Sequence, residues 1–222
     1  MVFLLYYPIL PNLIKYVTKI LKLDNFYVKI DYNFGNNLDF EILNMKKLKL
    51  DELKRVSVKE FKKQKKLPLV LILDNIRSLN NIGSIFRTAD AFSIKNLYLC
   101  GITGTPPHKE IHKTALGATE SVSWKYFENT CDAIKHLKTE GYKIYGIEQA
   151  DEAVMLNMYK PSQRKPIAFV FGNEVVGVDD KILDFLDGVI EIPQYGTKHS
   201  LNVAVSVGIV VWDYVSKTKK GL

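Results

Sequence analysis

The stretch Ile167–Gly177, IAFVFGNEVVG, joins a short apolar run to a polar loop that opens at Gly172 and closes at Gly177. A continuous apolar run of this length is typical of a strand buried on both faces of a parallel sheet. Glycine lets the backbone turn and lets a ligand approach closely, and Glu174 places a carboxylate in the same loop. A plain helix start is the alternative for this loop, because acidic residues follow it. The stretch therefore predicts an α/β fold with a polar loop at one edge of a sheet.

Similar apolar runs recur on both sides of this stretch and alternate with helix-like segments. We predict strands at Leu69–Asp74, Asn96–Cys100, Val122–Phe127, Lys143–Glu148, Ile167–Gly172 and Val189–Ile192. We predict helices at Leu79–Phe92, Lys109–Ala118, Thr130–Glu140 and Leu201–Ser216. Strands interleaved with helices favour a mostly parallel sheet that is covered by helices on both faces.

The composition fits one sizeable α/β domain with a short appendage. The chain has 222 residues, of which 47% are hydrophobic and 25% are charged. Its two cysteines, Cys100 and Cys131, form no CxxC pair and no ligand cluster, so we expect no disulfide framework, no metal site and a reducing, cytoplasmic setting. The apolar stretch Val2–Ile14 is interrupted by prolines and is shorter than the roughly 20 residues that span a bilayer, so we expect no membrane segment.

The first 44 residues show no clear period, and we predict no domain in them. The organised pattern begins at Met45, which suggests that Met45 is the natural start and that residues 1–44 are an extension of doubtful status. The rest divides into a basic arm or helix at 45–67, an α/β domain at 68–216 and a tail at 217–222.

The whole net charge of +7 lies in the basic arm. Residues 45–66 hold ten Lys and Arg against three acids, while the segments before and after are balanced. Such an arm suits attraction to a polyanion. A solvated amphipathic helix, with Leu50, Leu53 and Phe61 on its apolar side, is the equally simple alternative.

A second polar block, Asn81–Ala89 (NIGSIFRTA), follows the predicted strand Leu69–Asp74 and opens a helix. Ligands of open α/β sheets bind at the carboxyl ends of strands, where this block begins. Arg87 offers a planar five-donor fork that suits a phosphate. Taken alone, the block is equally explained by Asn81 capping the helix and Arg87 pairing with Asp90.

A third block follows the last predicted strand, with Ile192–Gly196 (IPQYG) running on to Ser200–Ala204 (SLNVA). Ser200 is a common type of helix cap, so a structural role is its simple explanation. Asn202 stands in an otherwise apolar helix start, and a buried asparagine needs a polar partner. A ligand or a neighbouring subunit would supply one.

Several other chemistries lack their motifs. No GxGxxG follows the first strand and no GxxxxGK[ST] loop is present, which removes the markers of dinucleotide and P-loop sites. His108 and His112 are four apart, but Lys109 stands where the zinc-protease pattern needs glutamate, so a metal site is not expected.

The order and spacing of the three blocks resemble the three motifs of the SpoU/TrmH branch of the SPOUT RNA methyltransferases, over about Pro68 to Ser216. The resemblance implies the SPOUT fold with a C-terminal deep trefoil knot, an exception to the rule against knotted chains. It also implies S-adenosyl-L-methionine (AdoMet) as cofactor, RNA as substrate and a homodimer with active sites at the subunit interface. The departures from the family pattern, Gln194-Tyr195 and His199, bear on substrate choice.

The same resemblance assigns site residues by position. The cofactor would be closed over by the loop around Gln149 and lined by Gly172, Ile192 and Leu201. The family's polar active-site positions match Asn81, Arg87, Glu174, Ser200 and Asn202.

The implied reaction moves a methyl group from AdoMet to a ribose 2′-oxygen of tRNA or rRNA. The family account makes Arg87 the base; in the alternative, Arg87 clamps a phosphate and the proton passes late to Glu174 or water. Ser200 and Asn202 would orient the ribose or Arg87, and Glu174 would hold its loop in shape. A SPOUT enzyme that methylates a base and a non-catalytic RNA-binding or assembly protein are the other readings. Compact members of the family often act on tRNA, but the sequence names neither the RNA nor the nucleotide.

Overall fold

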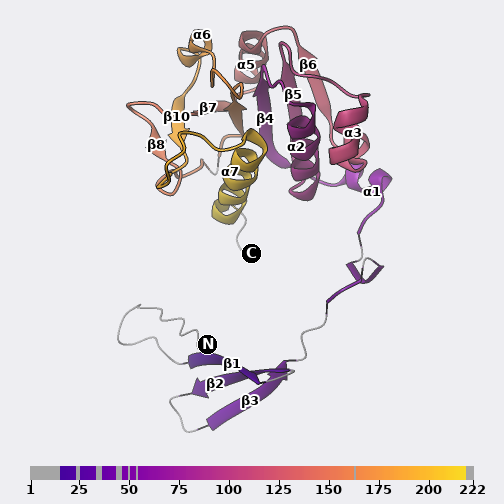
Figure 1. The fold of residues 1–222 in the computed structure, drawn as a ribbon, viewed down its shortest axis with the longest axis vertical. Helices are drawn as coiled ribbons and strands as arrows, with labels where there is room; N and C mark the ends of the chain where they lie inside the picture. Colours follow the sequence, from indigo (N-terminus) through magenta and orange to yellow (C-terminus); the bar gives the residue numbers. More distant parts are fainter. Residues whose placement is uncertain are drawn as a thin grey trace. The chain divides into compact units, whose positions relative to one another are not determined.

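The computed structural model describes residues 16–23, 26–33, 37–43, 47–49, 51–53, 55–162 and 164–218. Contacts within the chain separate two units, residues 1–55 and residues 56–222. Figure 1 shows the elements of both units, and each unit is described by itself.

The first unit contains a three-stranded antiparallel sheet in the order β1-β2-β3. Its strands are β1 (Tyr16–Leu23), β2 (Phe26–Asn33) and β3 (Asn37–Leu43). This sheet corrects the prediction that the first 44 residues hold no organised structure. Apolar and polar residues alternate along FYVKIDYN and NLDFEIL, which is the period-2 pattern of strands. The suggested start at Met45 lies outside the described residues.

The basic arm is not one continuous helix in its described part. It contains the short 3₁₀ helix η1 (Asp51–Leu53) and the six-residue helix α1 (Val58–Lys63). A capping box starts α1: the Ser57 hydroxyl accepts the Glu60 N–H at 3.3 Å, and the Ser57 N–H donates to the Glu60 carboxylate at 2.9 Å. Phe61 is buried, as the amphipathic alternative expected, while the lysines of α1 are exposed.

The second unit is built on a seven-stranded sheet in the order β6-β5-β4-β9-β7-β10-β8. Every pair of neighbouring strands is parallel, which confirms the predicted class of fold. The strands are β4 (Leu67–Asp74), β5 (Ile94–Cys100), β6 (Trp124–Phe127), β7 (Lys143–Ile147), β8 (Val154–Met155), β9 (Ile167–Phe171) and β10 (Gly188–Glu191). The predicted strand of the opening stretch, β9, lies between β4 and β7.

Helices cover both faces of this sheet, as Figure 1 shows. Alternate residues of β4 point to opposite faces and join separate cores: Leu71 packs in the cluster that includes α2, α3 and α7, and Ile72 packs in the cluster that includes α5 and α6. The helices are α2 (Leu79–Ala91), α3 (Lys109–Ala115), α4 (Ala118–Ser121), α5 (Thr130–Thr139), α6 (Asp180–Leu183) and α7 (Val203–Thr218).

The helix predicted over Lys109–Ala118 is in fact two helices. The chain enters the left-handed region at Leu116 (φ +50°) and Gly117 (φ +88°), which ends α3 and separates it from α4. His108 caps α3, because its Nδ1 accepts the Glu110 N–H at 3.2 Å. The two-residue strand β8 and the short helix α6 were not predicted as elements. No helix in the described ranges is long and apolar enough to cross a bilayer.

Candidate active site

The loops after β7, β9 and β10 line one cavity of about 570 Å³ at the carboxyl ends of these strands, together with the segment that leads into α7. This is the edge at which parallel α/β sheets bind ligands, and the volume suits a small organic cofactor. All three residues predicted to line a cofactor border the cavity: Gly172, Ile192 and Leu201. Glu174, Ser200 and Asn202 border it as well.

The loop after β9 is a tight turn fixed by Asn173. Asn173 and Gly177 exchange two backbone hydrogen bonds of 2.9 Å, and Asn173 Oδ1 accepts the Val175 N–H at 2.8 Å. A Cβ at Gly172 would meet the Gly177 carbonyl carbon at 2.1 Å, so no larger residue fits there without moving the loop. Asn173 Nδ2 donates to the Asn75 carbonyl at 2.6 Å, which ties the loop to the end of β4.

A second carboxylate, Glu148, supports this loop from the end of β7. It accepts the Val178 N–H at 3.0 Å and the Gln149 N–H at 2.8 Å, and it borders the cavity. A Cβ at Gly177, whose φ is +74°, would meet a Glu148 oxygen at 2.3 Å. The sequence analysis missed Glu148, although an acid at the end of a predicted strand on the same sheet edge was the available signal.

The loop around Gln149 lies across the third block, in the position expected of it. Gln149 Nε2 donates to the His199 carbonyl at 2.9 Å, and both residues border the cavity. The next residue, Ser200, is exposed, so its hydroxyl is accessible at the cavity rim.

Glu174 accepts hydrogen bonds at the N-terminus of α2. Its carboxylate receives the Arg77 N–H at 2.9 Å, the Ser78 N–H at 3.1 Å and the Asn81 side-chain amide at 3.1 Å. Burial opposes ionisation of this carboxyl, but the hydrogen bonds outweigh it, and the pKa of Glu174 falls below its ordinary value of 4.5. Glu174 is therefore an ionised anchor for the loop and a weak proton acceptor.

Asn81 connects the second and third blocks. Its Nδ2 donates to Glu174, and its Oδ1 accepts the Asn202 side-chain amide at 3.1 Å. Asn81 is not the cap of α2, as the simple alternative had it, because Ser78 fills that position and accepts the Asn81 N–H at 3.3 Å.

Asn202 differs from the prediction in two respects. It is exposed rather than buried, and its partner is Asn81 of the same chain rather than a ligand. Its Oδ1 accepts the N–H groups of Ala204 at 2.9 Å and Val205 at 3.4 Å, so Asn202, and not Ser200, caps the last helix. The predicted helix start at Leu201 is therefore two residues early.

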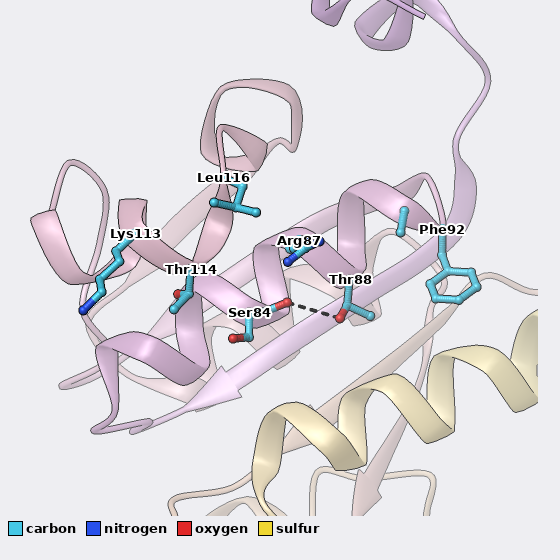
Figure 2. A pocket seen from close by; sticks show the side chains of 8 residues that line it. Ser84, Arg87, Thr88, Phe92, Lys113, Thr114 and Leu116 are labelled. Carbon is cyan, nitrogen blue, oxygen red and sulfur yellow. Dashed lines mark hydrogen bonds between the residues drawn. The ribbon is translucent and has the colours of Figure 1, made fainter. Parts of the chain in front are cut away.

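Arg87 is the one predicted site residue that the single chain does not bring to the cavity. It is exposed and borders a separate groove between α2 and α3 (Figure 2). Six residues correspond to about one and two-thirds helical turns, so Arg87 and Asn81 project from different sides of α2. Within the described part of the chain Arg87 makes no ion pair, and Asp90 instead accepts the Ser121 hydroxyl at 2.5 Å.

Comparison with known proteins gives the class of this fold and site. The model of the SpoU rRNA Methylase family matches residues 68–212, and the chain belongs to this family. It is 32% identical to the tRNA (guanosine(18)-2'-O)-methyltransferase of Aquifex aeolicus over 167 residues, which are 72% of this chain and 74% of the relative. It is 32% identical to the 23S rRNA (guanosine-2'-O-)-methyltransferase RlmB of Neisseria meningitidis over 144 residues, which are 65% of this chain but only 56% of the relative.

Solved structures agree with this assignment. The A. aeolicus TrmH/SpoU tRNA modifying enzyme superposes with a TM-score of 0.64 at 27% identity, covering 72% of this chain and 81% of that one. The AdoMet-bound rRNA methyltransferase of Sinorhizobium meliloti superposes with a TM-score of 0.65 at 25% identity, covering 72% and 61%. The resemblance inferred from the three blocks is confirmed.

Proposed function

We propose that this protein is an AdoMet-dependent methyltransferase that modifies a ribose 2′-hydroxyl of RNA. The observation that carries the proposal is the meeting of Gly172, Ile192, Glu174, Ser200 and Asn202 around one cavity at the sheet's ligand edge. Relatives in the same family are named as ribose 2'-O-methyltransferases of tRNA and of rRNA, so both substrate classes fit.

The cavity suits AdoMet in shape and chemistry. Gly172 has no room for a side chain and presents bare backbone, while Ile192 and Leu201 supply apolar surface. When bound there, AdoMet supplies an activated methyl group on a sulfonium, which is a good leaving group. The protein's task is then to place the 2′-hydroxyl in line with that methyl group and to allow loss of its proton.

The polar residues divide this task. Glu174 is ionised and fully engaged at the start of α2, so it supports the loop and does not take the proton. Ser200 has its hydroxyl at the rim of the cavity, where it orients the ribose. Arg87, with five donors, either clamps an RNA phosphate or removes the proton, and a substitution at this position separates the two roles.

The proposal includes a homodimer with the site at its interface. Arg87 lies outside the cavity of its own chain, so a second copy is needed to bring a guanidinium to it. An apolar stripe on α7 remains exposed, with Val205 51%, Ile209 38% and Trp212 54% accessible. These residues follow helical spacing and form a face suited to a partner subunit.

The same proposal extends to the threading of the chain and to its setting. A deep trefoil knot in the C-terminal part is supported by the place of β9 between β4 and β7, and by the third block passing beneath Gln149. The exposed lysines of α1 support a contact between the basic arm and RNA. A cytoplasmic location, where RNA and AdoMet are both present, completes the proposal.

Methyl transfer from radiolabelled AdoMet to tRNA and, separately, to rRNA tests the proposal. We expect a 2′-O-methylated nucleoside in one of the two pools, with the signal lost in Arg87→Ala. A methylated base would contradict ribose chemistry. Absence of both incorporation and AdoMet binding would favour a non-catalytic RNA-binding protein.

A further inference from the structure

The groove between α2 and α3 carries a second cation besides Arg87. It encloses about 550 Å³ and is bordered by Lys113 and Thr114 from α3, by Leu116 after it and by residues of α2. None of the residues that line it is acidic. Lys113 is exposed and, among the described residues, makes no ion pair. An accessible lysine with no carboxylate in its groove suits an anion.

Gly83 brings the two helices together at this groove. A Cβ at Gly83 would meet the Thr114 hydroxyl at 2.0 Å and the Ile111 carbonyl at 2.3 Å, so α3 rests directly on the α2 backbone. The Thr114 hydroxyl donates to the Asn80 carbonyl at 3.0 Å, which fixes the contact. Arg87 is four residues after Gly83 and therefore lies on the same side of α2, one turn along. The close packing thus places Lys113 at the border of the groove that holds Arg87.

The two cations cover different parts of the groove. Figure 2 shows Thr114 between Lys113 and Arg87, with the lysine ammonium directed away from the guanidinium. The hydroxyls of Ser84 and Thr114 both donate to the Asn80 carbonyl, at 2.9 Å and 3.0 Å, so their protons are already used. Lys113 and Arg87 are therefore the charged donors that the groove offers to a ligand.

The rest of the groove is apolar. Ala91, Phe92 and Leu116 border it, and Leu116 is 66% exposed. A strand of RNA presents alternating phosphates and sugar-base surfaces, which match a groove with spaced cations and an apolar wall. An acidic protein segment would satisfy the cations but would leave the apolar wall without a regular counterpart.

We propose that Lys113 binds a backbone phosphate of the substrate RNA, different from the phosphate that Arg87 contacts, and so fixes the register of the strand at the site. This inference rests on the proposed function and names a positioning residue for it. Lys113 touches neither the cofactor cavity nor the polar cluster at Asn81, so it acts on RNA alone.

The test compares Lys113→Ala with Lys138→Ala, an exposed lysine on α5 at the opposite face of the sheet. For Lys113→Ala we expect KM for RNA to rise roughly 3- to 10-fold, with kcat and the Kd for AdoMet unchanged, and the salt slope of RNA binding to fall by about one. Lys113→Arg keeps the positive charge and should restore most of the affinity. Lys138→Ala should behave as wild type.

An unchanged KM and an unchanged salt slope in Lys113→Ala would overturn the inference, and so would a lowered AdoMet affinity, which would indicate a structural role. The salt slope of RNA binding is measured without turnover. Failure of the wild-type protein to methylate RNA would therefore refute the proposed function and still leave Lys113 to be judged by binding.

Discussion

Asn81 and Asn202 lie 121 residues apart in the chain, and their side chains are hydrogen bonded, with Asn202 Nδ2 donating to Asn81 Oδ1 at 3.1 Å. Asn81 also donates to Glu174 at 3.1 Å, so one amide joins the starts of two helices to the loop after β9. An amide suits this position because it donates on one side and accepts on the other.

Replacing Asn81 by aspartate tests this double role. Asn81→Asp keeps an acceptor for Asn202 but places a second carboxylate against Glu174, where like charges repel. We expect it to lose at least as much stability as Asn81→Ala, which removes two hydrogen bonds of about 0.5–1.5 kcal/mol each. Urea unfolding near neutral pH measures both variants. An aspartate variant as stable as wild type would show that the two side chains do not depend on the amide.

The lowered pKa of Glu174 predicts a pH-dependent contribution to stability. A carboxyl whose pKa is lower in the folded state stabilises the fold above its unfolded pKa, and this contribution is lost as pH falls through the folded value. The pKa lies below 4.5, so Glu174→Gln should destabilise the protein at neutral pH and lose its difference from wild type in strong acid. Thermal unfolding across pH measures this, with Glu120→Gln, an exposed glutamate on α4, as control. A constant difference at all pH values would contradict it.

Gly172→Ala should damage the cofactor cavity. The added methyl group would collide with the Gly177 backbone, and overpacking of this kind costs about 1–3 kcal/mol of stability. We expect weaker AdoMet binding by calorimetry together with that loss. Gly196→Ala is the matched control for stability, because a Cβ there meets nothing within 4 Å. Equal stability of the two variants would contradict the role of Gly172.

Charge on the exposed face of α7 should prevent dimer formation. Trp212 is 54% exposed in the single chain, and Trp212→Glu would bury an unpaired carboxylate in the proposed interface. Sedimentation should show a monomer with little methyltransferase activity. Leu183→Glu, a substitution at a 39% exposed leucine on α6, should stay dimeric. A dimeric Trp212→Glu would place the interface elsewhere.

Arg87→Lys separates the two roles of the guanidinium. Lysine keeps the charge but loses the planar fork, so a clamp should weaken while the pH profile keeps its shape. If Arg87 is the base, single-turnover rates of the variant should shift their pH dependence toward the titration of lysine. A near-wild-type rate at every pH would exclude both roles.

The sequence was most informative where burial and backbone geometry leave few choices. The apolar strands β4 and β9 were predictable because both faces are covered, and Gly172 because only glycine fits its turn. The side from which Arg87 projects was not considered, since motif spacing was treated as proximity. Lys113 carried no signal, because its place depends on the fit of α3 against Gly83. The sheet β1-β2-β3 was missed although its alternation was present in the sequence.

The hydrogen bond from Asn202 has a consequence for how the protein is made. The helix that Asn202 caps is the last one of the described chain, and its partner Asn81 belongs to the first long helix of the unit. Proteins are synthesised from the N-terminus, so a nascent chain has its sheet strands long before its cavity can close. Premature termination anywhere before α7 would therefore yield a polypeptide with a complete parallel sheet and no means of holding a methyl donor.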